Sequence, residues 1–246
     1  MVEICCGGFE DAVVAYENGA DRIELNSALY LGGLTPSIGA FRLAKEHCPI
    51  PIICMVRPRG AGFYYSDLEY EVMKQDCREL LEAGADGIAF GFLTETVQIC
   101  EERTGEFVEL IHQYRKEAVF HRAIDCLADL ENGVDKLIEQ GVDRIMTSGG
   151  RRTAIEGQDN IRKLIKQYGE CIEILPGSGI HAFNASDFMK KTGALQIHSS
   201  CRDWSEDITT ETTHVTFSYD ENEHRNSYEY VNGILVRELV QTVNRK

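Results

Sequence analysis

Four polar side chains, Glu24, Arg57, His121 and His198, each fall within or just after a short apolar segment. Imidazole titrates near neutral pH, so His121 and His198 are candidates for a general acid and a general base. Glu24 could orient one imidazole, or act as a base if burial raises its pKa. Arg57 stays charged and could hold a carboxylate, phosphate or enolate oxygen through two parallel hydrogen bonds. The set predicts acid–base catalysis, although a buried structural network would use the same residue types.

Three turns rich in Gly and Ser follow predicted strands, at residues 147–150, 177–179 and 198–200. Barrel enzymes often bind phosphate with such loops and a helix N-terminus. We therefore expect an anion site, with the candidate residues Thr147, Ser148, Gly149, Gly177, Gly179 and Ser200. Tight turning is the alternative explanation, because Gly and Ser are common turn residues.

The elements that would position these residues alternate between short apolar strands and amphipathic helices. Strands are expected at residues 2–6, 22–25, 52–56, 87–90, 118–121, 144–147, 172–175 and 195–198. Helices are expected at residues 9–18, 37–47, 67–83, 105–115, 129–140, 154–168, 182–191 and 231–244. This alternation predicts one (β/α)8 barrel domain over residues 1–246, with its functional site at the carboxyl ends of the strands. An open doubly wound sheet is the structural alternative.

Residues 205–230 lack a helical period and are rich in polar residues. We expect a long excursion there, before the last helix, with an edge strand at 214–219.

The charge and composition of the chain indicate which classes of partner and which cellular location to expect. The net charge of −15 at pH 7 repels phosphate backbones, so nucleic acid is not an expected partner. No apolar run of about 18 residues that could span a membrane is present. The first residues do not resemble a signal peptide, so we expect a cytoplasmic protein. The nine scattered cysteines indicate free thiols, and without a CxxC pair a structural zinc site is not expected.

Several sequence blocks resemble the CutC family of copper homeostasis proteins. The blocks are residues 18–25 (NGADRIEL), 32–37 (GGLTPS), 55–60 (MVRPRG), 120–125 (FHRAID), 144–149 (RIMTSG) and 176–180 (PGSGI), followed by His198 and Ser200. The resemblance implies a barrel, a role in intracellular copper handling and copper as a bound ion. It implies no nucleotide cofactor and no assigned reaction, and analogy suggests a homodimer. Residues 95–100 (ETVQIC) depart from the family pattern, so the loop after the fourth strand should differ.

Copper binding would involve cysteines, because soft thiolates select Cu(I). The candidates are Cys5, Cys6 and Cys54, which lie on the first and third predicted strands. Cys5 and Cys6 point to opposite faces of one strand, so they should not bind one ion together. Cys6 and Cys54 share outward parity and are the expected metal ligands. The alternative explanation for each of these cysteines, and the one that the residue type favours, is a small buried hydrophobe.

Two other functions remain open. The chain could be an enzyme acting on a small phosphorylated or carboxylated metabolite through Glu24, Arg57, His121 and His198. It could instead be a scaffold that captures a partner with residues 205–230.

Overall fold

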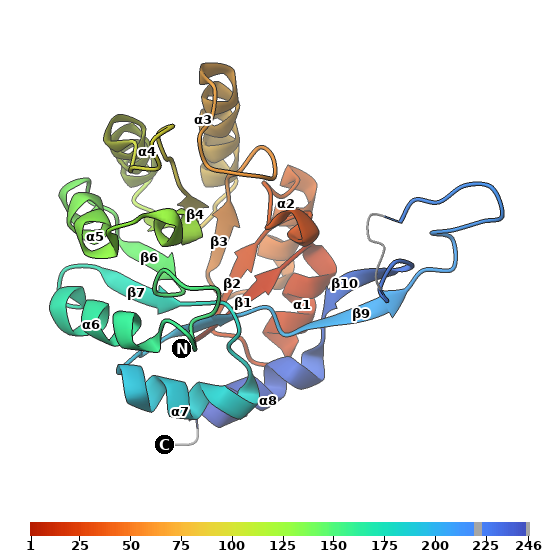
Figure 1. Ribbon diagram of the computed structural model, residues 1–246. Helices are drawn as coiled ribbons and strands as arrows, with labels where there is room; N and C mark the ends of the chain where they lie inside the picture. The colour runs from red at the N-terminus through yellow and green to blue at the C-terminus, as the bar shows by residue number, and fades with distance from the viewer. Residues whose placement is uncertain (219–222, 245–246) are drawn as a thin grey trace.

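The computed structural model describes residues 1–218 and 223–244. Eight parallel strands curl into a nearly closed barrel surrounded by helices (Figure 1). The strands are β1 (Val2–Cys6), β2 (Arg22–Leu25), β3 (Ile52–Met55), β4 (Gly87–Phe90), β5 (Glu117–Phe120), β6 (Arg144–Thr147), β7 (Glu173–Pro176) and β8 (Ile197–Ser199). Each strand from β1 to β7 pairs with its neighbour in sequence, and β8 pairs with β1. The predicted (β/α)8 barrel is therefore confirmed, and the open sheet is not formed.

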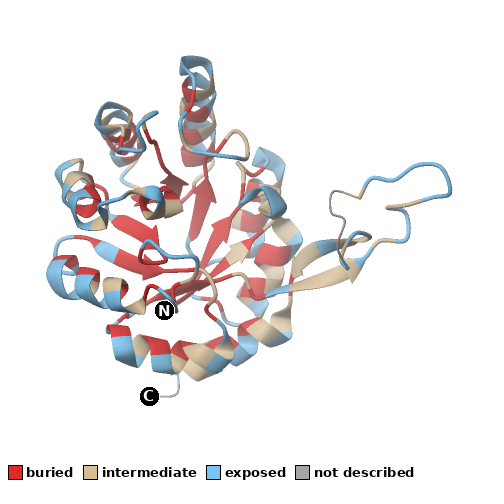
Figure 2. Cartoon of the chain, viewed as in Figure 1, coloured by how far each residue is buried: buried red, intermediate tan, exposed pale blue. Residues whose placement is uncertain are grey.

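Eight α-helices of the described residues lie outside the strands. They are α1 (Phe9–Glu17), α2 (Ile38–His47), α3 (Asp67–Glu82), α4 (Glu101–Gln113), α5 (Leu130–Glu139), α6 (Gln158–Tyr168), α7 (Ala182–Thr192) and α8 (Gly233–Asn244). Short 3-10 helices occupy Leu29–Leu31 and Arg122–Cys126. Side-chain caps fix some boundaries, as where Ser66 and Glu69 form a capping box at the start of α3. Figure 2 shows the helices buried on the side that faces the strands.

Two helices begin four residues away from their predicted starts. The α4 helix begins at Glu101, four residues before the predicted start, and its first turn is acidic, which suits the positive end of the helix dipole. The α6 helix begins only at Gln158. The preceding residues form turns, and the Ala154 amide donates to the Ser178 carbonyl (2.9 Å).

Side chains alternate along each strand between an outer apolar layer and the barrel lumen, which contains both apolar and polar groups. Outward residues such as Ile4, Ile23 and Ile88 pack against the helices. Inward residues Ile53, Met55, Ala89 and Val119 form a separate small apolar cluster. Polar side chains also face the lumen, and the buried ones include Glu3, Arg22, Glu24, Arg144 and His198. The barrel interior therefore contains polar groups that can support chemistry.

A projecting arm follows β8 and consists of β9 (Arg202–Glu206) paired with β10 (Ser227–Val231) (Figure 1). The predicted strand at 214–219 is wrong over its described residues, and Tyr219 lies outside them. The strands instead form at the two ends of the excursion, where aromatic residues provide cross-strand packing surface. The Asp11 carboxylate anchors the arm by accepting from the Val231 and Gly7 amides, each at 2.8 Å.

All nine cysteines lie within the described residues and are free thiols. None of the helices in residues 1–218 and 223–244 has the length and apolar character needed to cross a membrane.

Candidate functional site

Three side chains with metal-binding atoms meet inside the barrel, toward the carboxyl ends of its strands. They are Cys5 on β1, Glu24 on β2 and His198 on β8, and their ligand atoms all lie within 4.8 Å of one another. The strand register brings them together, because Cys5 lies opposite Glu24 and His198 lies opposite Glu3. The Cys5 thiol donates to Glu24 Oε2 (3.5 Å), and His198 Nε2 lies 3.9 Å from the same oxygen. A soft sulfur, an imidazole nitrogen and a carboxylate thus face one point.

Neighbouring polar groups orient this cluster. Glu3 Oε1 lies 2.8 Å from His198 Nδ1, which leaves Nε2 facing Glu24. Glu3 is itself paired with Arg22. The Asn26 amide donates to Glu24 Oε2 (2.9 Å). This is the arrangement that holds a metal-ligating histidine in many sites, where a carboxylate binds the second ring nitrogen.

Two buried oxygens beside the cluster have no hydrogen-bond partner among the described residues, namely Glu24 Oε1 and Asn26 Oδ1. Buried polar atoms are almost always satisfied in folded proteins, so an unpaired pair of acceptors indicates a place where a ligand, ion or water belongs. The residues present therefore fit a bound cation or a bound donor.

Burial and mutual charge shift the proton equilibria of the cluster. Burial would raise the pKa of Glu3, but the His198 hydrogen bond and the Arg22 charge outweigh it and lower that pKa to about 2. Burial raises the pKa of Glu24, and the charge of Glu3 adds to the rise. Burial would lower the pKa of His198, but the charge of Glu24 and the hydrogen bond to Glu3 raise it. Burial and Glu24 raise the pKa of the Cys5 thiol well above its ordinary value. The thiol of the metal-free site therefore retains its proton.

Arg57 and His121 form a second pair, joined through Phe63. The ring centroids of Phe63 and His121 are 4.8 Å apart, and the Arg57 guanidinium carbon lies 5.1 Å from the Phe63 centroid. Arg57 donates to the carbonyls of Leu31 (2.9 Å), Gly33 (3.1 Å) and Ala61 (2.5 Å). Its guanidinium therefore joins the loops after β2 and β3.

His121 is a neutral imidazole whose Nδ1 accepts from the Ala123 amide (3.2 Å). Burial, assisted by the charge of Arg57, lowers its pKa to about 3. Its Nε2 has no partner among the described residues. The structure thus buries all four predicted catalytic residues and arranges them as two pairs, Glu24 with His198 and Arg57 with His121. Their catalytic roles remain predictions.

The loop after β6, predicted to bind an anion, is bound to the chain's own Asp125 carboxylate. Asp125 accepts from the Thr147 hydroxyl (2.5 Å), the Ser148 amide (2.9 Å) and the Gly150 amide (3.0 Å). Gly149 has a positive φ of 73°, and a Cβ there would lie 2.6 Å from the Gly157 carbonyl oxygen. The donors that a free anion would need at this loop are therefore already engaged.

The other predicted anion-binding residues lie at the ends of β7 and β8. The Gly177 amide donates to the Thr147 carbonyl (3.0 Å), and a Cβ on Gly177 would lie 3.3 Å from the His198 side chain. The Gly179 carbonyl accepts from the Asn184 side-chain Nδ2 (2.9 Å), and Ser200 follows β8 in a half-buried position. Close packing accounts for Gly177, and the anion-binding role of all six predicted residues remains a prediction.

Cys6 and Cys54, the predicted copper ligands, are fully buried in the outer apolar layer. Leu25 on β2 lies between them in register, so their backbones are roughly 10 Å apart, two strand spacings. The cluster of metal-binding atoms contains neither of them. Their role as ligands remains a prediction, whereas the geometry favours Cys5.

Three contributors to these sites, Cys5, Asn26 and Asp125, are not among the predicted site residues. Cys5 is a candidate copper ligand in the sequence, and the signal that favours it over Cys6 and Cys54 is its inward parity with Glu3, on the strand next to Glu24. Asn26 follows the same parity as Glu24. Asp125 gave no such signal, since its contact with residues 147–150 depends on the 3-10 turn after β5.

Comparisons with known proteins agree on one family. The profile described as the CutC family matches residues 1–203. A CutC-family protein of Treponema denticola is 48% identical over 197 residues, covering 80% of this chain and 79% of the relative. The human copper homeostasis protein cutC homolog is 40% identical over 202 residues, covering 82% of this chain and 73% of the relative.

Solved structures show the same fold. The putative copper homeostasis protein CutC from Streptococcus agalactiae is similar with a TM-score of 0.76 and 29% identity, covering 81% of this chain and 98% of that chain. A phosphoribosyl anthranilate isomerase from Thermococcus kodakaraensis is similar with a TM-score of 0.59 and 14% identity, over 100% and 99% of the two chains. The second likeness concerns the barrel alone.

Proposed function

This chain belongs to the CutC family, and from that premise we propose that it acts in copper homeostasis by binding Cu(I) at Cys5, Glu24 and His198. The observation that carries the proposal is the convergence of their ligand atoms within 4.8 Å. Related proteins bear the name copper homeostasis protein, which supports copper as the ion.

The donor set suits Cu(I) better than a hard cation. Thiolate and imidazole are ligands that copper prefers, whereas Mg²⁺ and Ca²⁺ take oxygen ligands. Cys5 would supply the sulfur and His198 Nε2 the nitrogen, with Glu3 holding the imidazole from behind. Glu24 would serve as a third ligand, since its Oε1 has no partner in the described structure.

A competition experiment separates this site from the other cysteines. Cu(I) is titrated into the protein against a chromogenic chelator, using wild type, Cys5→Ser, His198→Gln, Cys6→Ser and Cys54→Ser. We expect Cys5→Ser and His198→Gln to weaken binding by at least about tenfold, the effect of losing roughly 1.4 kcal/mol. The matched variants Cys6→Ser and Cys54→Ser should bind as wild type does. Unchanged affinity in Cys5→Ser, or a selective loss in Cys54→Ser, would reject the assignment.

A second candidate function is acid–base catalysis on a small molecule, and it is favoured by Glu24 Oε1, which has no partner among residues 1–218 and 223–244. Glu24 would act as the base because burial raises its pKa. His198, oriented by Glu3, would act as the acid. The test is a thermal-shift screen of carboxylated and phosphorylated metabolites. A ligand that stabilises wild type but not Glu24→Gln would support the enzyme, and a metabolite set that shifts neither protein would count against it.

A further inference from the structure

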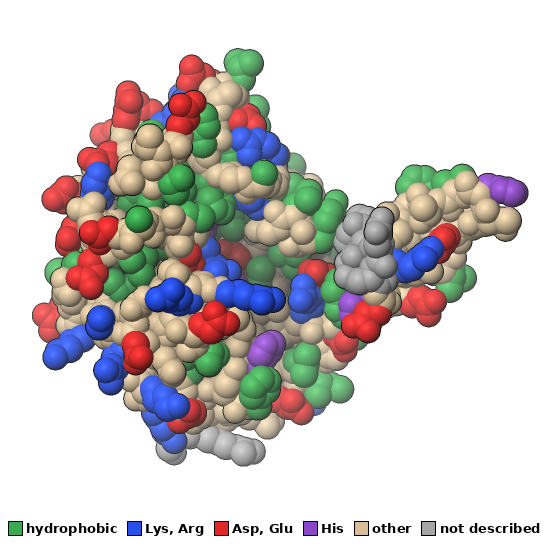
Figure 3. All heavy atoms as spheres, in the orientation of Figure 1, with side chains coloured by type: hydrophobic (Ala, Val, Ile, Leu, Met, Phe, Trp, Pro, Cys, Tyr) green, Lys and Arg blue, Asp and Glu red, His purple; other side chains and the backbone are tan. Residues whose placement is uncertain are grey.

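A groove at the mouth of the barrel is lined by three arginines, Arg122, Arg151 and Arg152, together with Phe63 and Glu156. Its volume of about 590 Å³ is in the range of sites for small metabolites. Figure 3 shows a hollow in the middle of the molecule with Lys and Arg side chains beside it. We propose that this groove binds a small molecule carrying a phosphoryl group. This groove is separate from the proposed copper site and contains none of its residues.

The charge of the groove contrasts with the charge of the chain. The whole sequence carries 40 acidic and 25 basic residues, so three guanidiniums around one hollow form a local exception. Asp125 and Glu156 also line the groove, so its formal charge is +1, from three arginines and two acids. The Asp125 carboxylate is already engaged by the residue 147–150 loop and by Arg122 Nε (2.8 Å), which leaves the guanidiniums of Arg151 and Arg152 with the one other carboxylate, that of Glu156. A local positive potential in an acidic protein attracts anionic ligands to that point.

Arg151 and Arg152 are exposed, and neither guanidinium forms an ion pair or hydrogen bond with a residue of the described structure. Adjacent unpaired charges of one sign repel each other. A bound anion would remove this repulsion and receive the forked N–H donors that match phosphate oxygens.

The backbone that bears these two arginines is held in place, although neither guanidinium has a partner within the part of the chain that the structure describes. The Arg151 carbonyl accepts from the Ser148 hydroxyl, and the Arg152 carbonyl accepts from the Ser178 hydroxyl (3.1 Å). The Ala154 amide is bound to the Ser178 carbonyl (2.9 Å). A loop fixed before the ligand arrives loses less entropy on binding, which is the property of a prepared site.

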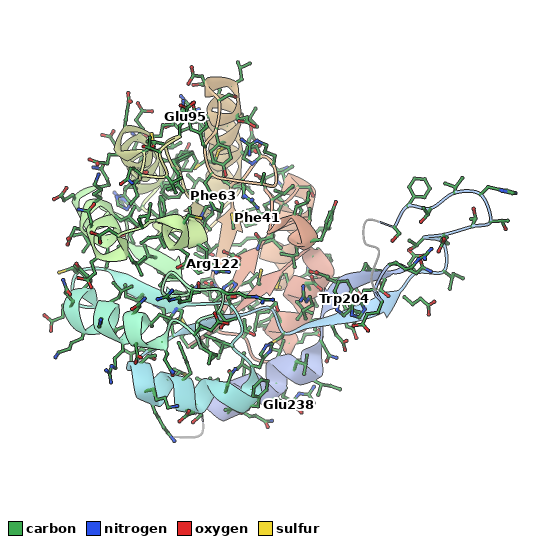
Figure 4. The ribbon with its side chains drawn as sticks, in the orientation of Figure 1. Phe41, Phe63, Glu95, Arg122, Trp204 and Glu238 are labelled. Atoms are coloured by element: carbon green, nitrogen blue, oxygen red, sulfur yellow. The ribbon has the colours of Figure 1, made fainter. Side chains whose placement is uncertain are left out.

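Phe63 supplies an apolar wall that an inorganic ion alone would not require. Figure 4 labels Phe63 and Arg122, which come from the loop after β3 and the turn after β5. Behind Phe63 lies His121, whose buried Nε2 has no partner among the described residues. Guanidiniums beside an aromatic ring match a ligand with a phosphoryl group and a carbon body.

The probe for this site is pyrophosphate, titrated by calorimetry into the protein in metal-free buffer at constant ionic strength. The test variant is Arg151→Ala/Arg152→Ala, whose side chains are exposed, so the fold should persist. The matched control is Arg42→Ala/Arg162→Ala, which removes the same charge from exposed positions on α2 and α6. Citrate, titrated in parallel, distinguishes phosphoryl recognition from general attraction of carboxylates.

We expect saturable binding of pyrophosphate to wild type and to the control. The test variant should bind at least about tenfold more weakly, because hydrogen bonds to charged groups are lost, and citrate should bind more weakly than pyrophosphate. The proposal is overturned if wild type shows no saturable binding in the millimolar range, if both double variants weaken equally, or if citrate binds as tightly as pyrophosphate. Cu(I) affinity and pyrophosphate affinity are measured in separate experiments with different variants. A negative result in one experiment therefore does not reject the proposal that the other tests.

Discussion

Replacing Asp125 with Ala tests whether its carboxylate organises the mouth of the barrel. The carboxyl side chain is 8% exposed and accepts from the Thr147 hydroxyl and the Ser148 amide, which belong to buried residues. A buried donor left without a partner costs about 1–3 kcal/mol. The Gly150 amide and Arg122 are more exposed and can turn to water. The two buried donors therefore predict a loss of about 4 kcal/mol in the free energy of unfolding.

A loss of that size should lower the melting temperature by roughly 8–16 °C for a chain of this length. The assay is thermal unfolding followed by circular dichroism. Asp125→Asn, which keeps one acceptor oxygen, should lie between Asp125→Ala and wild type. The control Glu170→Ala removes an exposed acid and should melt close to wild type. If Asp125→Ala melts within roughly 2 °C of wild type, the size of a surface effect, the carboxylate does not organise this loop as we argue.

Three further predictions concern protons and the arm. Copper affinity should rise with pH by up to about tenfold per unit in chelator competition, because Cys5, with its raised pKa, must release a proton to bind metal; a flat profile would contradict this. Below pH 6.5 the unfolded imidazole of His121 binds a proton, while the folded one does not until about pH 3, so stability falls as pH falls. His121→Asn should therefore lose less stability than wild type between pH 7 and 5 in urea unfolding, and equal losses would refute the argument. Replacing residues 207–226 with a short turn should leave the circular dichroism spectrum and the copper affinity unchanged, because β9 and β10 connect directly to the barrel. Loss of the folded spectrum would instead show that the excursion stabilises the barrel.

The alternation of apolar strands and amphipathic helices was enough to predict the barrel. Buried parallel strands and their covering helices have distinct hydrophobic periods, so β1, β2, β4 and β6 have the predicted bounds. The arm was harder, because the β9–β10 pair depends on contacts between segments separated by a polar excursion. Its strands carry little periodic signal, and the hydrogen bond from Val231 that holds the arm to Asp11 joins residues far apart in the sequence.

The candidate site was predictable in part, through parity. Inward-facing Glu24 and His198 share one lumen, as their alternation with apolar neighbours indicated. The same rule applied to Cys5 would have favoured it over Cys6 and Cys54, whose outward parity places them among helix-packing residues. The hydrogen bonds from the residue 147–150 loop to Asp125 could not be inferred from the sequence. A turn rich in Gly and Ser has the same sequence whether its amides bind a ligand or a side chain.

Copper K-edge X-ray absorption on the Cu(I)-loaded protein identifies the atoms that bind copper. We expect one sulfur ligand and an imidazole nitrogen, with the sulfur shell lost in Cys5→Ser and the imidazole scattering lost in His198→Gln. A shell of two sulfurs without imidazole, unchanged in Cys5→Ser, would contradict this expectation.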